Sequence, residues 1–166
     1  IEKPSDIITK QAAAAVGQCE LMYTYDRLFG QYNHTVAQML LTWEDFDHEN
    51  RLRNLQNTLE RLLQLHTIPI INENDPIACE EYSLGDNDTL AGMLASITDS
   101  RLTVILTTEQ GLRERNEDGT LGQRISVVKE LSESVRAMAG GTDNSEFSIG
   151  GMSSKLHAAE IVTAAG

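Results

Sequence analysis

The sequence predicts an α/β fold with a largely parallel sheet. Short apolar runs that suit strands alternate with longer segments whose apolar residues recur every three or four positions, as they do in helices. Of the 166 residues, 40% are hydrophobic and 23% charged, which is ordinary for a folded protein and argues against disorder. The length suits one domain, residues 1–166, with a substantial hydrophobic core.

The first helix is predicted over residues 7–31, where apolar residues form one stripe. Ser5 or Asp6 precedes it and can cap its N-terminus. Gly17 lies inside it and predicts close contact with a neighbour, because glycine costs about 1 kcal/mol relative to alanine in a helix. Residues 35–41 (TVAQMLL) then form a short apolar run that reads as a buried strand.

The middle of the chain continues the alternation. A helix is predicted over residues 51–65, with leucines 52, 55, 59 and 62 on one face, and a strand over 68–71. A second helix is expected over 87–96. Residues 102–106 (LTVIL) are the clearest strand, since they are rich in β-branched residues and bounded by polar ones.

The last third is predicted to be a polar loop over 107–122, a helix over 125–139 and a final helix that Gly150, Gly151 and Met152 open. The final helix carries Lys155 one turn from its start.

Bulk properties exclude several functions. The net charge of -12 and isoelectric point near 4.6 argue against nucleic acid as a partner, because such binding needs a basic face. Two cysteines are too few for a disulfide framework, and the four histidines show no metal-ligand spacing. No apolar stretch is long enough for a membrane span, and no signal peptide is recognisable. We therefore expect a cytoplasmic protein without membrane partners or protein-ligated metal.

Two clusters of acids and amides follow strands or begin helices, where α/β sheets place ligand-binding groups. Asn72 and Asp75 belong to the first, and Asp86, Asn87 and Asp88 to the second. A single acidic turn is usually a solvated loop, but two at consecutive junctions favour a site. The acids can bind an ammonium group and the amides a carboxylate, so the clusters suit an amino acid.

A phosphate site is predicted at the last helix. Gly150, Gly151 and Met152 offer backbone N–H groups at its N-terminus, and Lys155 adds a positive charge. A plain flexible loop is an equally good reading of the glycines alone. The chain has no G-x-S-x-G, Walker A, G-x-G-x-x-G or EF-hand pattern. Together the clusters suggest phosphoryl transfer to a small amino-acid-like substrate.

Six segments resemble the glutamate 5-kinases, a branch of the amino acid kinase family. They are residues 10–11 (KQ), 14–18 (AAVGQ), 37–42 (AQMLLT), 68–75 (IPIINEND), 85–88 (GDND) and 150–155 (GGMSSK). The resemblance covers essentially the whole chain, and the NEND and GDND pair is specific to glutamate kinases within the family. It implies a three-layer αβα sandwich, incomplete in this chain.

The resemblance implies that ATP phosphorylates the γ-carboxylate of L-glutamate, with Mg²⁺ on the phosphates, in the first step of proline biosynthesis. The implied glutamate-binding residues are Asn72, Asp75, Asp86 and Asn87. Asp88 would organise the catalytic lysines, and Lys155 would neutralise charge on the transferring phosphoryl group. The implied nucleotide-binding residues are Thr107, Thr108, Gly150, Gly151, Met152 and Lys155.

This sequence departs from the family pattern at several positions. Thr108 stands where the family usually has Asp, and Ser148-Ile149 stand where it has Gly-Thr. The family motif Gly-Leu-Tyr reads Gly111-Leu112-Arg113, and the Asp-Pro that usually follows is missing. We therefore expect altered handling of ATP.

The chain also looks truncated at both ends. The family's N-terminal strand–helix units and the C-terminal PUA domain of many members are absent from it. We expect these 166 residues alone to be inactive, because half of the phosphate clamp is missing.

Two other functions stay open at this point. One is a kinase for another acidic amino acid or a carbamate-like substrate, and the other is a non-catalytic module that binds glutamate and regulates. The resemblance also favours a homo-oligomer, a dimer or tetramer, and feedback inhibition by proline.

Overall fold

The computed structural model describes residues 6–78, 84, 86–116, 118–139 and 151–166. The chain divides into two compact units, Ile1–Leu84 and Gly85–Gly166, and each is described by itself.

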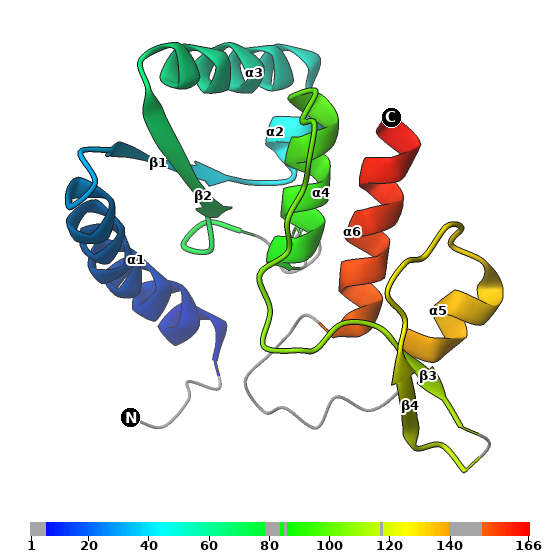
Figure 1. Ribbon diagram of the computed structural model, residues 1–166. Coiled ribbons are helices and arrows are strands. Elements are labelled where there is room, and N and C mark those ends of the chain that lie inside the picture. Colours follow the sequence, from blue (N-terminus) through cyan, green and yellow to red (C-terminus); the bar gives the residue numbers. More distant parts are fainter. Residues whose placement is uncertain (1–5, 79–83, 85, 117, 140–150) are drawn as a thin grey trace. The chain divides into compact units, whose positions relative to one another are not determined.

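The first unit contains a parallel pair of strands, β1 (Thr35–Leu41) and β2 (Thr67–Glu73), paired from Thr35 with Thr67 to Leu41 with Glu73. Helices α2 (Glu44–Asp47) and α3 (Glu49–Gln64) connect the two strands (Figure 1). A parallel pair needs such a crossover, so this unit confirms the predicted α/β class. It shows two strands of the expected sheet and not the full sandwich.

Helix α1 (Ile7–Gly30) begins where the sequence predicts. Asp6 caps it, because the Thr9 N–H donates to the Asp6 Oδ1 over 2.8 Å. The close contact predicted for Gly17 is wrong within the described part of the chain: a Cβ there would meet no atom within 4 Å.

The core of the first unit lies between α3 and the strands. Leu55 and Leu59 are 6% and 4% exposed and belong to the predicted leucine face, and α3 contacts β2. Leu41, at the end of β1, is also buried, at 5% exposed. Leu55 and Leu59 are four residues apart and so occupy the same face of α3.

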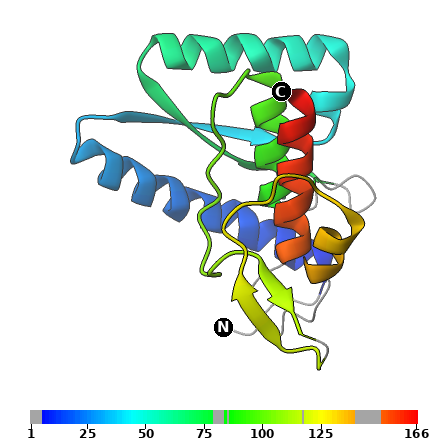
Figure 2. The same ribbon diagram turned by 45° about the vertical axis from the view of Figure 1, so that its right-hand side comes forward.

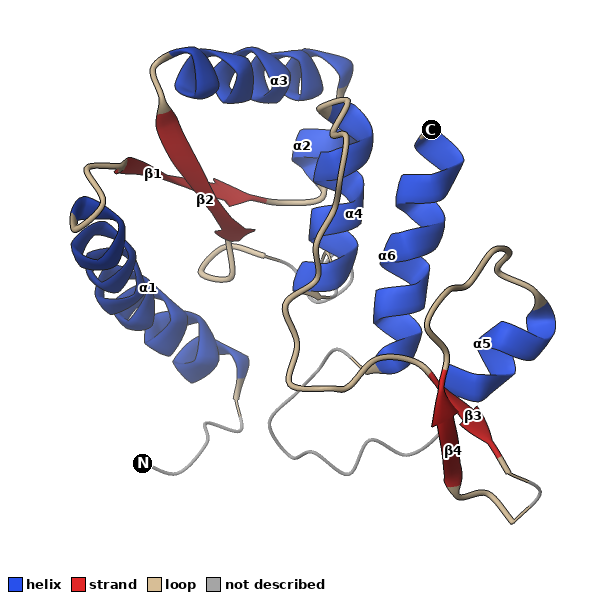
Figure 3. Ribbon diagram, viewed as in Figure 1, coloured by secondary structure: helices blue, strands red, loops and turns tan. Residues whose placement is uncertain are grey.

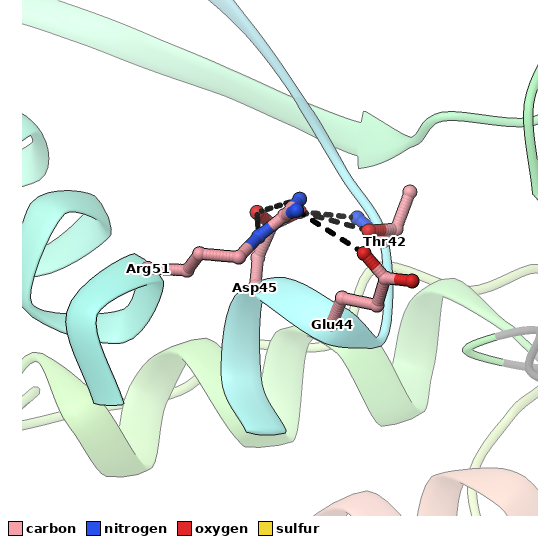
Figure 4. A network of polar contacts seen from close by, with 4 residues as sticks. All are labelled: Thr42, Glu44, Asp45 and Arg51. Carbon is pink, nitrogen blue, oxygen red and sulfur yellow. Dashed lines mark hydrogen bonds and ion pairs between the residues drawn. The ribbon is translucent and has the colours of Figure 1, made fainter. Parts of the chain in front are cut away.

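A polar network fixes the chain just after β1 (Figure 4). The Thr42 N–H donates to Asp45 Oδ2 over 2.7 Å, and the Arg51 guanidinium donates to Asp45 Oδ1 over 2.7 and 3.0 Å and to Glu44 over 3.1 Å. Partial burial alone would raise the pKa of Asp45, but these hydrogen bonds outweigh it and lower that pKa. The network joins the start of α2 to α3.

The second unit is built on two neighbouring helices, α4 (Asn87–Ile97) and α6 (Met152–Ala165), which run side by side with their N-terminal ends together (Figures 1 and 2). Gly92 allows this approach. A Cβ at Gly92 would lie 3.1 Å from the Ala158 carbonyl oxygen and 3.2 Å from its Cα. Ala158 itself is 1% exposed.

The polar loop predicted over 107–122 is wrong in part. It contains β3 (Arg113–Arg115) and the first two residues of β4 (Leu121–Arg124), and the two strands form an antiparallel pair. Gly119 adopts a φ of 81° in the turn between them, and the Asn116 N–H donates to the Thr120 carbonyl over 3.0 Å. Turn residues that looked like a loop therefore belong to a hairpin.

The strand predicted over 102–106 is wrong for the described chain, where the segment pairs with no strand (Figure 3). Leu102, Val104 and Leu106 are 78%, 66% and 93% exposed. A strand depends on a partner ladder and a covering layer, and neither is present for this segment among the described residues.

The helix predicted over 125–139 is much shorter, α5 (Glu133–Ala139). The Ile125 N–H donates to the Leu112 carbonyl over 2.8 Å, which extends the hairpin and keeps that residue out of a helix. Ser132 Oγ accepts from the Val135 N–H over 3.4 Å at the start of α5. Among the described residues, no helix combines the length and apolar character needed to cross a membrane.

Candidate functional site

A half-buried ion pair joins the first turns of α4 and α6. Lys155 Nζ lies 2.9 Å from Asp88 Oδ2, and the two side chains are 16% and 18% exposed. Ser154 Oγ donates to the same oxygen over 3.3 Å. The pair spans 67 residues of sequence, and the parallel approach of the two helices brings it together. The structure thus unites the two predicted catalytic residues.

The surroundings of this pair favour negative charge. Each helix N-terminus carries a partial positive charge, and the two ends lie together. Lys155 adds a full positive charge in the first turn of α6, where the helix dipole disfavours it, and Asp88 offsets that cost. An anion placed here would meet N–H groups and one ammonium, which is the chemistry of a phosphate site.

Two residues beside the pair, Asp86 and Gly151, are the N-caps of α4 and α6. Asp86 caps α4, since the Thr89 N–H donates to its Oδ1 over 2.7 Å. Asn87, the first residue of α4, is exposed. Gly151 is the N-cap of α6, and its carbonyl accepts from Ser154 Oγ over 2.9 Å. Asp86 and Asn87 thus lie within two residues of Asp88.

The acid–amide cluster of the first unit lies at the end of β2. Asn72 is paired in register with Leu40, and the Asn74 N–H donates to the Leu41 carbonyl over 2.7 Å. The Glu73 carboxylate accepts from the Leu84 N–H over 2.8 Å. Backbone hydrogen bonds and the Glu73 side chain therefore hold this end of the strand in place.

Asp75 follows in a tight turn. Although it is an exposed residue, the atoms packed around its carboxylate remove part of its hydration, and this loss together with the Glu73 charge raises the pKa of Asp75. A carboxylate in such a setting gains from a cation, such as the ammonium of an amino acid.

The remaining predicted residues are those expected to bind the nucleotide. Thr107 and Thr108 are exposed, and the Thr107 Oγ1 accepts from the Glu109 N–H over 3.2 Å. Gly150 lies outside the described residues, as does the Ser148-Ile149 departure. Met152 is half-buried at the start of α6. Asn72 and Asp75 belong to the first unit and the remaining predicted residues to the second.

The sequence interpretation assigned no role to two residues that the structure places against the site. Ser154 touches Asp88, and Gln18 accepts a hydrogen bond from Asn72 over 3.3 Å. Each stands within a recognised motif, but neither has a spacing that predicts its partner. Within the described chain, no group of three or more acids, histidines or cysteines is arranged to hold a metal ion.

Comparison with known proteins agrees with this picture. A model of the amino acid kinase family matches residues 2–166. The chain is 45% identical over 166 residues to a glutamate 5-kinase of Clostridium acetobutylicum, covering 98% of this chain and 61% of that protein. It is 42% identical to one from Desulfotalea psychrophila (98% and 43%) and 40% identical to one from Clostridium tetani (99% and 62%).

The chain therefore spans 43% to 62% of the length of these curated relatives. The family match extends over nearly every residue, including both acid–amide clusters and the Asp88–Lys155 pair. This chain belongs to the amino acid kinase family.

Proposed function

We propose that the chain is part of an enzyme that transfers the γ-phosphoryl group of ATP to the γ-carboxylate of L-glutamate, the first step of proline biosynthesis. The Asp88–Lys155 pair at two helix N-termini is the observation that carries this proposal, because it is a prepared site for a transferring phosphoryl group. The names of the relatives, each a glutamate 5-kinase, supply the substrate.

In the proposed reaction, a γ-carboxylate oxygen of glutamate attacks the γ-phosphorus of ATP. The new P–O bond forms as the bond to the β-phosphate oxygen breaks, and ADP leaves with that electron pair. The attacking carboxylate is already ionised at neutral pH, so no general base is required. Lys155 offsets the negative charge that spreads over the transferring group, and Asp88 holds the Lys155 ammonium in place.

The residues proposed to bind glutamate are Asn72, Asp75, Asp86 and Asn87. Asp75 is suited to the α-ammonium group, since its raised pKa reflects a partly desolvated carboxylate beside the negative charge of Glu73. The amide of Asn72 or Asn87 can donate to a carboxylate of the substrate.

The nucleotide is proposed to contact Thr107, Thr108, Gly150, Gly151, Met152 and Lys155. The phosphates of the nucleotide are proposed to carry a Mg²⁺ ion, as is usual in phosphoryl transfer. When bound, that ion would neutralise charge on the phosphates.

Several wider features belong to the same proposal. The parallel pair β1–β2 would be part of the larger central sheet of a three-layer αβα sandwich. The enzyme would work in the cytoplasm as a homo-oligomer, a dimer or tetramer, with proline as a feedback inhibitor. Size-exclusion chromatography with light scattering and proline titration of the activity test the last two points.

The decisive experiment traps the product. Glutamyl phosphate reacts with hydroxylamine to give a hydroxamate, which can be measured for the complete protein with ATP, Mg²⁺ and glutamate. We expect hydroxamate with glutamate and much less with aspartate or carbamate. Failure to form it, with glutamate binding intact, would instead support the regulatory module. The comparisons do not favour that module, since the relatives reported above are all named as kinases.

A further inference from the structure

Helix α1 carries two glutamines toward the end of β2 and the turn that follows it. Gln11 Nε2 donates to the Ala78 carbonyl over 3.2 Å, and Gln18 Oε1 accepts from Asn72 Nδ2 over 3.3 Å. The two glutamines are seven residues apart, about two helical turns, so they share one face of α1. One face of this helix thus holds both ends of the segment that includes Asp75.

The Gln18–Asn72 contact is partly buried and joins residues 54 positions apart. Gln18 Nε2 is buried and has no hydrogen-bond partner among the described residues. A buried donor without a partner is unfavourable, so stability alone does not explain an amide at this position. An apolar side chain of similar length would fill the same space without that penalty.

We propose that Gln18 is a positioning residue for glutamate, acting through Asn72. This inference rests on the proposed function, in which Asn72 binds the substrate. The hydrogen bond to Gln18 engages one edge of the Asn72 carboxamide and fixes its rotation. The other edge is then oriented before the amino acid arrives, which lowers the cost of binding.

Gln11 makes this role separable from the docking of the helix. Its bond to the Ala78 carbonyl ties α1 to the turn independently of Gln18. Removing the Gln18 amide should therefore leave the helix in place and release only the Asn72 side chain.

The test uses the complete protein and Gln18→Met, which keeps the length of the side chain and removes the amide. We expect KM for glutamate to rise about three- to tenfold, the size of one lost hydrogen bond, with kcat and KM for ATP within about twofold of wild type. Gln31→Met is the matched control, since Gln31 is an exposed glutamine just after the same helix and should leave KM unchanged.

A double-mutant cycle separates positioning from general damage. In an Asn72→Ala background, adding Gln18→Met should change KM for glutamate by less than about twofold, because the residue through which Gln18 acts is gone. An equal rise in both backgrounds, or no rise in either, would overturn the proposal.

If Gln18→Met does not fold, Gln18→Asn takes its place: it keeps an amide but is one methylene too short to reach Asn72. The same rise in KM supports the proposal, and a wild-type KM refutes it. Wild-type activity is measured first, so absence of glutamate-dependent turnover would reject the proposed function and not the Gln18 assignment by itself.

Discussion

The two units hold their candidate residues by different means. In the first, hydrogen bonds fix the residues at the end of β2: the main chain pairs with β1, and the Asn72 amide bonds to Gln18. In the second, a charge pair between Asp88 and Lys155 bridges two helices that approach closely at Gly92. Hydrogen-bond geometry suits recognition of a fixed substrate, whereas a charge pair suits a reaction in which charge moves.

This difference predicts which kinetic constant is controlled by the end of β2 and which by the Asp88–Lys155 pair. Changes at the end of β2 should act mainly on glutamate binding, and changes at the helix pair mainly on turnover. Four experiments in the complete protein can sharpen or break that division.

The largest effect is expected for Lys155→Met. Loss of the ammonium would remove the proposed stabilisation of the transferring phosphoryl group, and kcat should fall about 100- to 1000-fold. Arg136→Met is the matched control. Arg136 lies in α5 and forms an exposed ion pair with Glu160 of α6, the helix that also carries Lys155. Steady-state kinetics with both substrates measure kcat and KM for the two variants and for the wild type. A Lys155→Met enzyme with normal kcat and raised KM for glutamate would contradict the assignment of turnover to the helix pair.

Asp75→Asn should act on binding. Loss of the carboxylate that is proposed to bind the ammonium should raise KM for glutamate about 10- to 100-fold, the cost of one charged hydrogen bond, and lower kcat much less. Asp47→Asn, an exposed acid in α2, provides the control. Equal losses in kcat and kcat/KM for Asp75→Asn would show that this residue acts in the transition state.

Two glycine substitutions compare the helices directly. Gly92→Ala should destabilise the protein by about 1 to 3 kcal/mol and lower kcat, because the new methyl meets the Ala158 backbone and pushes α6 away. Gly17→Ala should stabilise it by about 0.5 to 1 kcal/mol, since alanine favours the helix and the methyl meets no atom within 4 Å. Urea unfolding measures both changes. A stabilising Gly92→Ala would show that the helices can separate freely.

The smallest effect is a contrast in pH dependence within the first unit. The lowered pKa of Asp45 contributes stability that is present above its ordinary pKa of 3.8 and is lost as the pH falls through the lowered value. The raised pKa of Asp75 has the opposite sign, so stability falls as the pH rises from 3.8 through the raised value.

Unfolding curves between about pH 3 and 7 for Asp45→Asn and Asp75→Asn should therefore differ from wild type in opposite directions. Asp45→Asn should be the less stable protein at neutral pH, because it loses hydrogen bonds to a charged group. Parallel shifts of the two variants would contradict the assigned pKa directions.

The sequence predicted local features better than paired ones. Residues 35–41 form the predicted strand, and Asp6 caps the predicted helix, because caps and short periodic patterns depend on neighbours in sequence. Residues 102–106 have an equally strong strand pattern and form no ladder among the described residues. Strand propensity reflects packing against a partner, which a single segment does not contain.

The site shows the same limit. The residue types at Asp88 and Lys155 indicated charge and phosphate chemistry, and resemblance to the glutamate 5-kinases linked the two residues. The contact of Gln18 with Asn72 depends on how α1 lies against the strands, which no local pattern in either segment specifies. Helix periodicity also overextended α5, because a backbone bond from Ile125 to Leu112 competes with the helix.

The capping role of Asp86 has a consequence for how binding reaches the reaction centre. A ligand bound by the Asp86 carboxylate would share that carboxylate with the Thr89 N–H, which donates to its Oδ1 at the start of α4. Asp88 lies in that same turn, so the proposed binding of the amino acid at Asp86 would be thermodynamically linked to the position of the Lys155 ammonium. The exchange rate of the Thr89 amide hydrogen, measured with and without the amino acid and in the wild type and Lys155→Met, would report this linkage.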